Sequence, residues 1–120
     1  MNAASSLGDL LRIGDLEIRP REGLALAAGR AMSLSVREFA LLAVLASRAG
    51  RIVARDDLYR EVWGQTLRRG DRSVDVYVHK LRVKLDEALP GKCEIHTHVG
   101  FGYRLDSAPS HPFHTATTDS

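Results

Sequence analysis

The chain has 120 residues, 44% of them hydrophobic, with 17 Lys and Arg against 15 Asp and Glu. This length suits one domain with a buried core and is too short for two domains of ordinary size. The longest apolar run, Phe39 to Ala46, is eight residues, far below the ~20 that a transmembrane helix needs. We therefore expect no membrane segment. Because Cys93 is the only cysteine, we also expect no internal disulfide and a reduced, cytoplasmic setting.

Changes in composition mark both ends of the predicted domain. Residues 107–120 contain six Ser and Thr, two prolines and one large apolar residue, Phe113. This composition is typical of a disordered tail, and residues 1–6 form a shorter disordered head. The domain itself is expected over residues 7–106.

The first third of the domain has the pattern of short strands. From Leu11 to Ser33, apolar residues are separated by turn signals at Gly14-Asp15, Pro20, Gly23 and Gly29. Short strands are expected at Leu24 to Leu26 and at Ala31 to Leu34. A small antiparallel sheet therefore opens the chain.

The first helix begins at a capping box, Ser35-Val-Arg-Glu38. In this motif the Ser35 side chain accepts a hydrogen bond from the Glu38 amide, and the Glu38 side chain accepts one from the Ser35 amide. The helix should run to about Arg48 and end at Gly50. Since it is apolar nearly all round, we expect it to be buried in the centre of the domain. A second helix is expected over about Arg55 to Trp63, with Gly64 ending it.

The third helix should run from Asp71, as N-cap, to Leu89, where Pro90-Gly91 stops it. After it, Cys93 to Val99 and Tyr103 to Leu105 flank a glycine-rich turn. This arrangement predicts a C-terminal β-hairpin.

The third helix has two different faces when its residues are placed at about 100° intervals. The predicted core stripe holds Val74, Val78, Leu81, Leu85 and Ala88, and the opposite face holds Arg72, Val76, His79, Lys80 and Val83. Valines between cations suit a DNA major groove, where aliphatic groups meet thymine methyls and Arg or Lys reaches guanine edges and phosphates. A protein interface is the alternative.

Positive charge is also concentrated here. Residues 68–84 hold six Lys and Arg against two Asp, although the net charge of the whole chain is only +2. Such a segment is typical of a phosphate-contacting surface. A solvated helix face explains the same charges, so charge alone leaves both interpretations open.

Five blocks of residues resemble the output domain of OmpR/PhoB-type bacterial response regulators, and the resemblance as a whole covers about Leu10 to Leu105. They are Leu34-Ser-x-x-Glu38-Phe-x-Leu-Leu42, Gly50-Arg-Ile-Val-x-Arg-x-x-Leu58, Val62-Trp-Gly64, Asp71-Arg-Ser-Val-Asp-Val-Tyr-Val78 with Leu81-Arg-x-Lys-Leu85, and Ile95-x-Thr97 with Gly100-x-Gly-Tyr-Arg104. The resemblance implies an α+β winged helix-turn-helix fold: an N-terminal antiparallel sheet, three helices and a C-terminal hairpin wing. It also implies a sequence-specific DNA-binding transcription regulator whose third helix, about 71–89, enters the major groove while the wing, 93–105, lies on the adjacent backbone and minor groove.

The resemblance also implies a role for individual residues. Phosphate contacts match Arg72, Ser73, Tyr77 and Arg82, groove contacts match His79 and Lys80, and wing contacts match Thr97 and Gly100. The helical spacing adds Val76 and Val83 to the DNA-facing set. The loop that faces RNA polymerase in activators of the family matches Gln65, Thr66, Leu67, Arg68, Arg69 and Gly70.

Three positions depart from the family pattern. His79 and Val99 stand where arginine is common, in the groove and before the wing glycine respectively. Ala54 occupies the usual Ser/Thr cap of the second helix, a change that should cost about 1 kcal/mol of stability. No receiver domain precedes the matching residues, so no phosphoacceptor aspartate is assigned. Whether the chain is a stand-alone regulator or part of a longer one stays open.

The expected partner is double-stranded DNA, with direct repeats as the typical site, and RNA polymerase is a further candidate. We expect a monomer in solution that pairs on DNA, a nucleoid-associated location, and neither cofactor nor metal.

Glu94, His96 and His98 alternate along one strand as metal ligands could, but an outward-facing polar row has the same pattern. No catalytic grouping is present, so we predict that the domain is not an enzyme. The alternative function is a winged-helix protein-interaction module with weak or no specific DNA binding.

Overall fold

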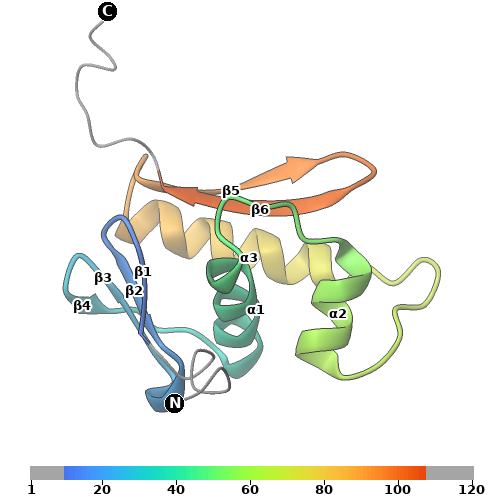
Figure 1. The fold of residues 1–120 in the computed structure, drawn as a ribbon, viewed down its shortest axis with the longest axis horizontal. Coiled ribbons are helices and arrows are strands. Elements are labelled where there is room, and N and C mark those ends of the chain that lie inside the picture. Colours follow the sequence, from blue (N-terminus) through green and yellow to red (C-terminus); the bar gives the residue numbers. More distant parts are fainter. Residues whose placement is uncertain (1–9, 108–120) are drawn as a thin grey trace, which may run out of the picture.

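The computed structural model describes residues 10–107, and it places two antiparallel sheets around three helices (Figure 1). The predicted head, residues 1–6, lies outside this range, as does the tail beyond Ser107. The elements follow in the order β1 (Leu11–Ile13), β2 (Leu16–Arg19), a 3-10 turn (Pro20–Glu22), β3 (Leu24–Ala27), β4 (Arg30–Ala31), α1 (Val36–Ser47), α2 (Arg55–Trp63), α3 (Ser73–Ala88), β5 (Cys93–His98) and β6 (Gly102–Ser107). This order confirms the predicted winged-helix fold class.

The N-terminal sheet has the strand order β1-β2-β3-β4, all antiparallel. Leu16 and Ile18 of β2 are fully buried, and they pair with the buried Ala27 and Ala25 of β3. The period of two along these strands therefore turns one face of the sheet to the core. The last strand is shorter than predicted, because after Ala31 the chain turns toward the cap of α1 and leaves residues 32–34 without strand structure.

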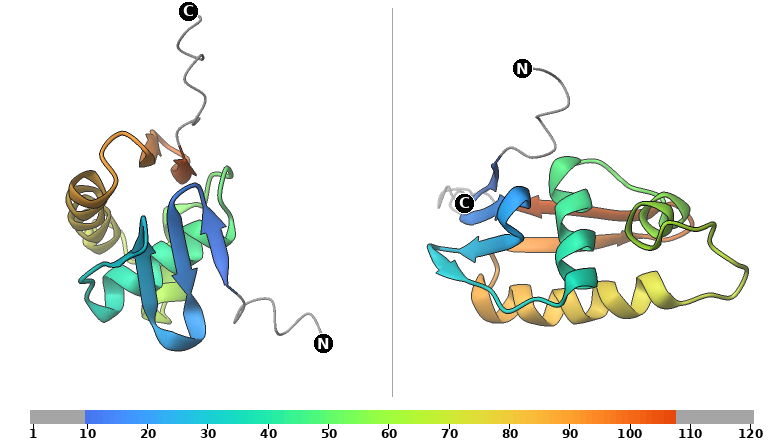
Figure 2. Two further views of the ribbon diagram at one scale, coloured as in Figure 1. Left: turned by 90° about the vertical axis from the view of Figure 1, so that its left-hand side faces the viewer. Right: turned by 90° about the horizontal axis from the view of Figure 1, so that it is seen from below.

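Helix α1 begins at the predicted capping box. The amide of Glu38 donates to Ser35 Oγ at 3.2 Å, and the amide of Ser35 donates to Glu38 Oε1 at 2.8 Å. Leu41, Leu42 and Leu45 are fully buried. The helix contacts α2, α3 and both sheets, and Figure 2 shows it between the N-terminal sheet and α2. The predicted central position of this helix is confirmed.

Helix α3 begins later than predicted. Arg72, not Asp71, occupies the N-cap position, and it makes no side-chain capping bond. Asp71 still serves the helix start, because its Oδ1 accepts a 2.8 Å hydrogen bond from the amide of Ser73. At the other end Ala88 is only half-buried, whereas Leu89 is 2% exposed. The chain leaves helical geometry at Leu89, so the angle of 100° per residue no longer applies there.

The C-terminal hairpin is the wing of the fold. Its two strands pair from Cys93 opposite Ser107 to His98 opposite Gly102, so the last strand ends one residue beyond the predicted domain limit of 106. Val53, just before α2, joins the base of the wing through a 2.8 Å bond from its amide to the Tyr103 carbonyl and a 3.0 Å bond in return. Among residues 10–107, no helix is long and apolar enough to cross a membrane.

Gly102 makes the close approach between the wing and this segment possible. It has φ of +145°, and a Cβ at this position would lie 2.1 Å from the carbonyl oxygen of Val53. A side chain here would therefore combine a strained backbone with a clash against backbone atoms.

Candidate nucleic-acid interface

The two faces of α3 lie as the sequence predicts. Val74, Val78, Leu81 and Leu85 are at most 1% exposed, whereas Val76 and Val83 are 48% and 44% exposed. His79 and Lys80 are exposed beside these valines. A shallow hollow on this face is lined by Arg72, Asp75, Val76, His79 and Lys80. The exposed surface of the helix therefore combines cations, an imidazole and aliphatic groups.

An aromatic series supports the first turns of this face. Trp63 at the end of α2 stacks on Tyr59 at a centroid distance of 4.9 Å and meets the edge of Tyr77 at 5.5 Å. Lys80 Nζ lies 4.7 Å from the centre of the Tyr77 ring. A cation over an aromatic face is attracted to it, so Tyr77 holds Lys80 near the surface of α3.

Arg82 joins α3 to the wing. Its Nε and Nη2 atoms donate to the carbonyl of Ile95 at 2.9 and 2.7 Å, and Nη2 also donates to Thr97 Oγ1 at 2.6 Å. The Nη1 atom takes part in none of these bonds. Two residues that the family resemblance places at phosphates, Arg82 and Thr97, are thus in direct contact with each other.

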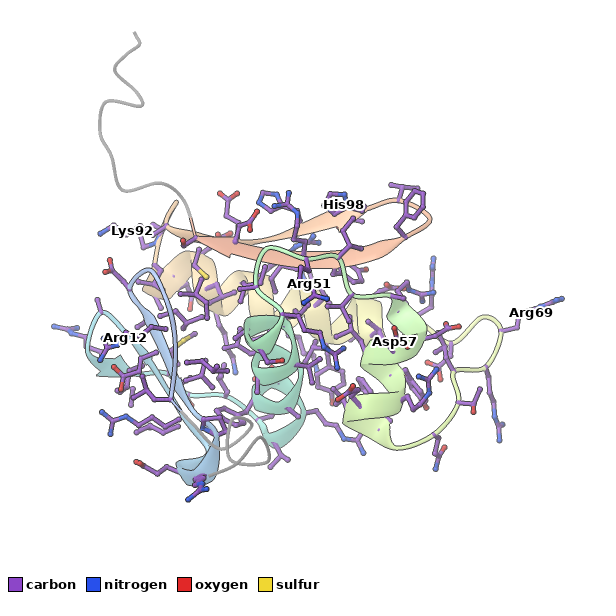
Figure 3. All side chains as sticks on the ribbon, viewed as in Figure 1. Arg12, Arg51, Asp57, Arg69, Lys92 and His98 are labelled. Atoms are coloured by element: carbon purple, nitrogen blue, oxygen red, sulfur yellow. The ribbon has the colours of Figure 1, made fainter. Side chains whose placement is uncertain are left out.

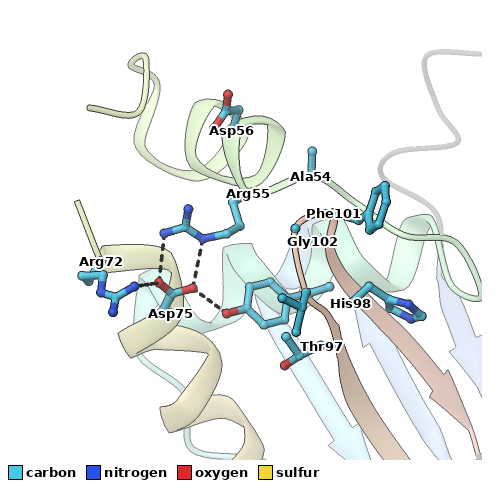
Figure 4. Close-up of a pocket in the computed structure, with 12 residues that line it drawn as sticks. Ala54, Arg55, Asp56, Arg72, Asp75, Thr97, His98, Phe101 and Gly102 are labelled. Carbon is cyan, nitrogen blue, oxygen red and sulfur yellow. Dashed lines mark hydrogen bonds and ion pairs between the residues drawn. The ribbon is translucent and has the colours of Figure 1, made fainter. Parts of the chain in front are cut away.

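Asp75 is a second junction, and Figure 4 shows it between Arg72 and Arg55. It accepts hydrogen bonds from Arg55 Nε at 3.0 Å, Arg55 Nη2 at 2.9 Å and the Tyr103 hydroxyl at 2.5 Å. Arg72 Nη1 lies 3.7 Å from the same carboxylate. One side chain of α3 therefore contacts residues of α2 and β6.

These contacts change the ionisation of the groups involved. Burial acts to raise the pKa of Asp75, but the hydrogen bonds from Arg55 and Tyr103 outweigh it, and the pKa is below its ordinary value. Burial, assisted by the bond to Asp75, raises the pKa of Tyr103 to about 12. The cluster is thus built around an ionised Asp75 and a neutral Tyr103.

An ion pair between α3 and α1 removes one cation from the predicted basic surface. Lys84 Nζ donates to Glu38 Oε1 at 2.6 Å and to the carbonyl of Ser33 at 2.8 Å. Glu38 is 4% exposed. Burial acts to raise its pKa, but the bonds from Lys84 and Ser35 outweigh that effect and lower it. Lys84 therefore stabilises the join between α1 and α3.

A cavity of about 560 Å³ separates the start of α3 from the tip of the wing (Figure 4). Arg55 and Arg72 face it from α2 and from the start of α3, and residues 97–103 line it from the wing. Thr97 and Gly100, both predicted wing contacts, are among the lining residues, and both are exposed.

The loop between α2 and α3 contains the residues expected to face polymerase. Gln65, Thr66, Arg68, Arg69 and Gly70 are exposed, and Arg69 projects away from the domain (Figure 3). Leu67 differs, because it is partly buried against the core. This contact anchors the middle of the loop and leaves its polar residues on the surface.

The two wing histidines have polar neighbours. His98 Nε2 accepts a 3.0 Å hydrogen bond from Arg104 Nε, and His96 Nε2 lies 3.8 Å from carboxylate oxygens of Glu94 and Asp106. Within residues 10–107, no group of three His, Cys, Asp or Glu side chains is arranged to hold a metal ion.

No pattern in the sequence points to a role for Arg55, Asp75 or Tyr103. All three lie in the blocks that carry the family resemblance, at the end of Gly50-Arg-Ile-Val-x-Arg, within Asp71 to Val78 and in Gly100-x-Gly-Tyr. Their place in these blocks was the one signal in the sequence that could have identified them. Arg55 and Tyr103 are 20 and 28 residues away from Asp75 in the sequence, and helical or strand periodicity does not predict contacts over such separations.

Comparison with known proteins agrees with this geometry. Residues 29–105 match the family described as "Transcriptional regulatory protein, C terminal". The chain belongs to this family of OmpR/PhoB-type winged-helix DNA-binding domains, which is not a family of enzymes.

Individual relatives cover the same region. The chain is 38% identical over 105 residues to the transcriptional activator protein IrlR of Burkholderia pseudomallei, covering 84% of this chain and 45% of that protein. It is 36% identical to the transcriptional regulatory protein CpxR of Klebsiella pneumoniae, covering 82% of this chain and 42% of that protein. The chain thus spans less than half the length of these relatives.

Two solved structures share the fold. The DNA-binding domain of CpxR from E. coli superposes with a TM-score of 0.77 at 33% identity, covering 84% of this chain and 99% of that one. The DNA-binding domain of RstA from Klebsiella pneumoniae, solved in complex with the RstA box, has a TM-score of 0.73 at 34% identity, covering 82% and 97%.

Proposed function

We propose that the chain reads a specific double-stranded DNA site as part of a transcription regulator, with α3 in the major groove and the wing on the adjacent backbone. The exposed face of α3 carries this proposal. Val76 and Val83 lie beside His79 and Lys80 on that face, and this combination suits base edges and thymine methyls. Phosphate contacts are proposed for Arg72, Ser73, Tyr77, Arg82, Thr97 and Gly100.

The nature of the relatives supports the proposal. IrlR is named a transcriptional activator, and RstA was solved with its DNA box. We also propose that the chain is a monomer in solution and pairs on direct repeats at the nucleoid of the cytoplasm. We further propose that the exposed residues of loop 65–70 face RNA polymerase.

Selection of bound sequences from a random DNA pool, followed by affinity measurements at two salt concentrations, tests the main proposal. We expect an enriched motif, repeated at about one helical turn, and a steep loss of affinity with salt, with a slope of about −0.9 for each phosphate contact. Binding without enrichment would contradict base reading by α3.

One observation favours a second candidate, a protein-interaction module. Val99 is 88% exposed at the position where arginine is common in the family, so the wing lacks that cation. If the chain binds no DNA even at low salt, this candidate replaces the first.

A further inference from the structure

Two large apolar side chains are exposed at the tip of the wing. Val99 and Phe101 are 88% and 72% exposed, on either side of Gly100. The turn that carries them is closed by a 2.8 Å hydrogen bond from the amide of Phe101 to the carbonyl of His98. Packing of the domain does not require an apolar residue at either position, because neither side chain contributes to the core.

The tip carries no Lys or Arg. Residues 97–103 contain neither, and the nearest cation along the strand, Arg104, is bonded to His98 and paired with Asp106. A tip of this composition offers apolar surface and no side-chain cation to a phosphate. Beside the phosphate contacts proposed for Thr97 and Gly100, its exposed Val99 and Phe101 side chains suit recognition by shape and apolar contact.

The tip of the wing lies next to the exposed face of α3 that is proposed to contact DNA. Val99 and Phe101 line the 560 Å³ cavity together with Arg72 and Asp75, and Figure 4 shows Phe101 and Arg72 at opposite ends of it. Arg72 and Asp75 also line the hollow over Val76, His79 and Lys80. The two depressions therefore adjoin, so a duplex lying along the exposed face of α3 would reach the wing tip.

The base of the wing is firmly held. Arg82 ties β5 to α3 through Ile95 and Thr97. Tyr103 pairs with Val53 and donates to Asp75, while Gly102 lies directly against the Val53 carbonyl. The tip is thus presented on a support that resists displacement, as insertion of a side chain between bases requires.

We propose that Val99 and Phe101 enter the minor groove of DNA as an apolar wedge, with Phe101 partly unstacking one base step. The proposal rests on the DNA binding proposed above and adds a second reading site to it. Apolar wedges kink DNA most readily at flexible TA or CA/TG steps. Such a step is expected about half a helical turn from the bases that α3 contacts.

The test uses the 120-residue chain and a duplex carrying one selected site. Energy transfer between dyes at the duplex ends reports the bend, and 2-aminopurine at the candidate step reports unstacking. We expect wild type to bend the duplex by about 20° or more. Phe101→Ala should abolish both signals and weaken binding about fivefold or more. Its salt slope should equal that of wild type, because no phosphate contact is lost.

Val36→Ala is the matched control. Val36 is an apolar side chain that is 84% exposed, comparable to Val99 and Phe101, but it lies at the start of α1 and lines neither depression. This variant should leave bend, fluorescence and affinity unchanged. As a second variant, Val99→Arg should steepen the salt slope by about one unit, because it places a cation beside the backbone. Circular dichroism checks that each variant is folded.

Three outcomes would overturn the wedge. The first is specific binding by wild type with no bend and no 2-aminopurine signal. The second is a Phe101→Ala defect confined to DNA with two sites, which would assign the tip to contact with a second copy of the chain. The third, absence of DNA binding by wild type, would remove the proposed function as well, whereas the first two leave that function standing.

Discussion

The guanidinium of Arg55, at the start of α2, donates two hydrogen bonds of 3.0 and 2.9 Å to the carboxylate of Asp75 on α3. The same carboxylate accepts the hydroxyl of Tyr103 from the wing. Asp75 therefore fixes the positions of α2 and the wing relative to the helix that carries the proposed base contacts. It lies beside the proposed DNA surface and acts on that surface through the elements it holds.

Asp75→Asn should lower the free energy of unfolding by about 2 kcal/mol, because it leaves Arg55 and Tyr103 without their charged acceptor. Urea denaturation at neutral pH measures the loss. Asp86→Asn is the control, since Asp86 is exposed on the same helix. Because the folded pKa of Asp75 is lowered, its contribution exists above the unfolded value near 4 and disappears as pH falls through the folded pKa. Wild type and Asp75→Asn should therefore converge in acid, and a constant difference would contradict this account.

Tyr103→Phe should reveal the opposite pH dependence. The pKa of Tyr103 is raised to about 12, above the unfolded value of about 10. Its stabilising effect is complete below the unfolded pKa and is lost as pH rises through the folded one. The stability difference between wild type and Tyr103→Phe should shrink by about 2–3 kcal/mol over that window. Thermal unfolding at a series of alkaline pH values measures it, and a difference independent of pH would refute the raised pKa.

Lys80→Ala should weaken binding to the selected DNA site by about 1–3 kcal/mol and relax the preference at one base pair. Fluorescence anisotropy with matched and single-base-changed duplexes measures both effects. Lys92→Ala removes the same charge near the far end of α3, where Lys92 lies 3.4 Å from Asp15, and should have little effect. An equal loss on random DNA would restrict Lys80 to phosphate contact.

Ala28→Asn should stabilise the domain by about 0.5–1 kcal/mol. Ala28 has φ of +50° in the turn between β3 and β4 and is followed by Gly29 at +84°. Two consecutive left-handed residues define the hairpin turn that Asn-Gly favours, whereas Ala pays for its Cβ in that region. Differential scanning calorimetry measures the change. An unchanged or lower melting temperature would contradict this account.

Local signals predicted most of the fold. The Ser35–Glu38 box, Gly64 and the buried stripe from Val74 to Leu85 all lie where hydrogen bonding and helical geometry require them. Ala54 provides no side-chain cap to α2, as expected from a residue without a hydrogen-bonding side chain. The errors lie at ends of elements, at β4, at both ends of α3 and at both ends of β6, where tertiary packing competes with local preference.

The candidate site was less predictable, because its charges are set by distant partners. The segment 68–84 counts as strongly basic in sequence, yet Lys84 is bonded to Glu38, 46 residues away, and Arg82 is bonded to Thr97, 15 residues away. Periodicity identifies which side of α3 a residue occupies. It carries no information about which other element meets that residue there.

The contact between Gly102 and Val53 separates the wing into parts with different freedom to change in evolution. A side chain at Gly102 would meet the Val53 carbonyl, so substitution there disturbs the attachment of the wing to the domain. Val99 and Phe101, only one to three positions away, contribute nothing to the core. Descendants of this chain could therefore exchange the tip residues without disturbing the attachment beneath them and, if the tip reads DNA as proposed, could acquire new target sites by this route.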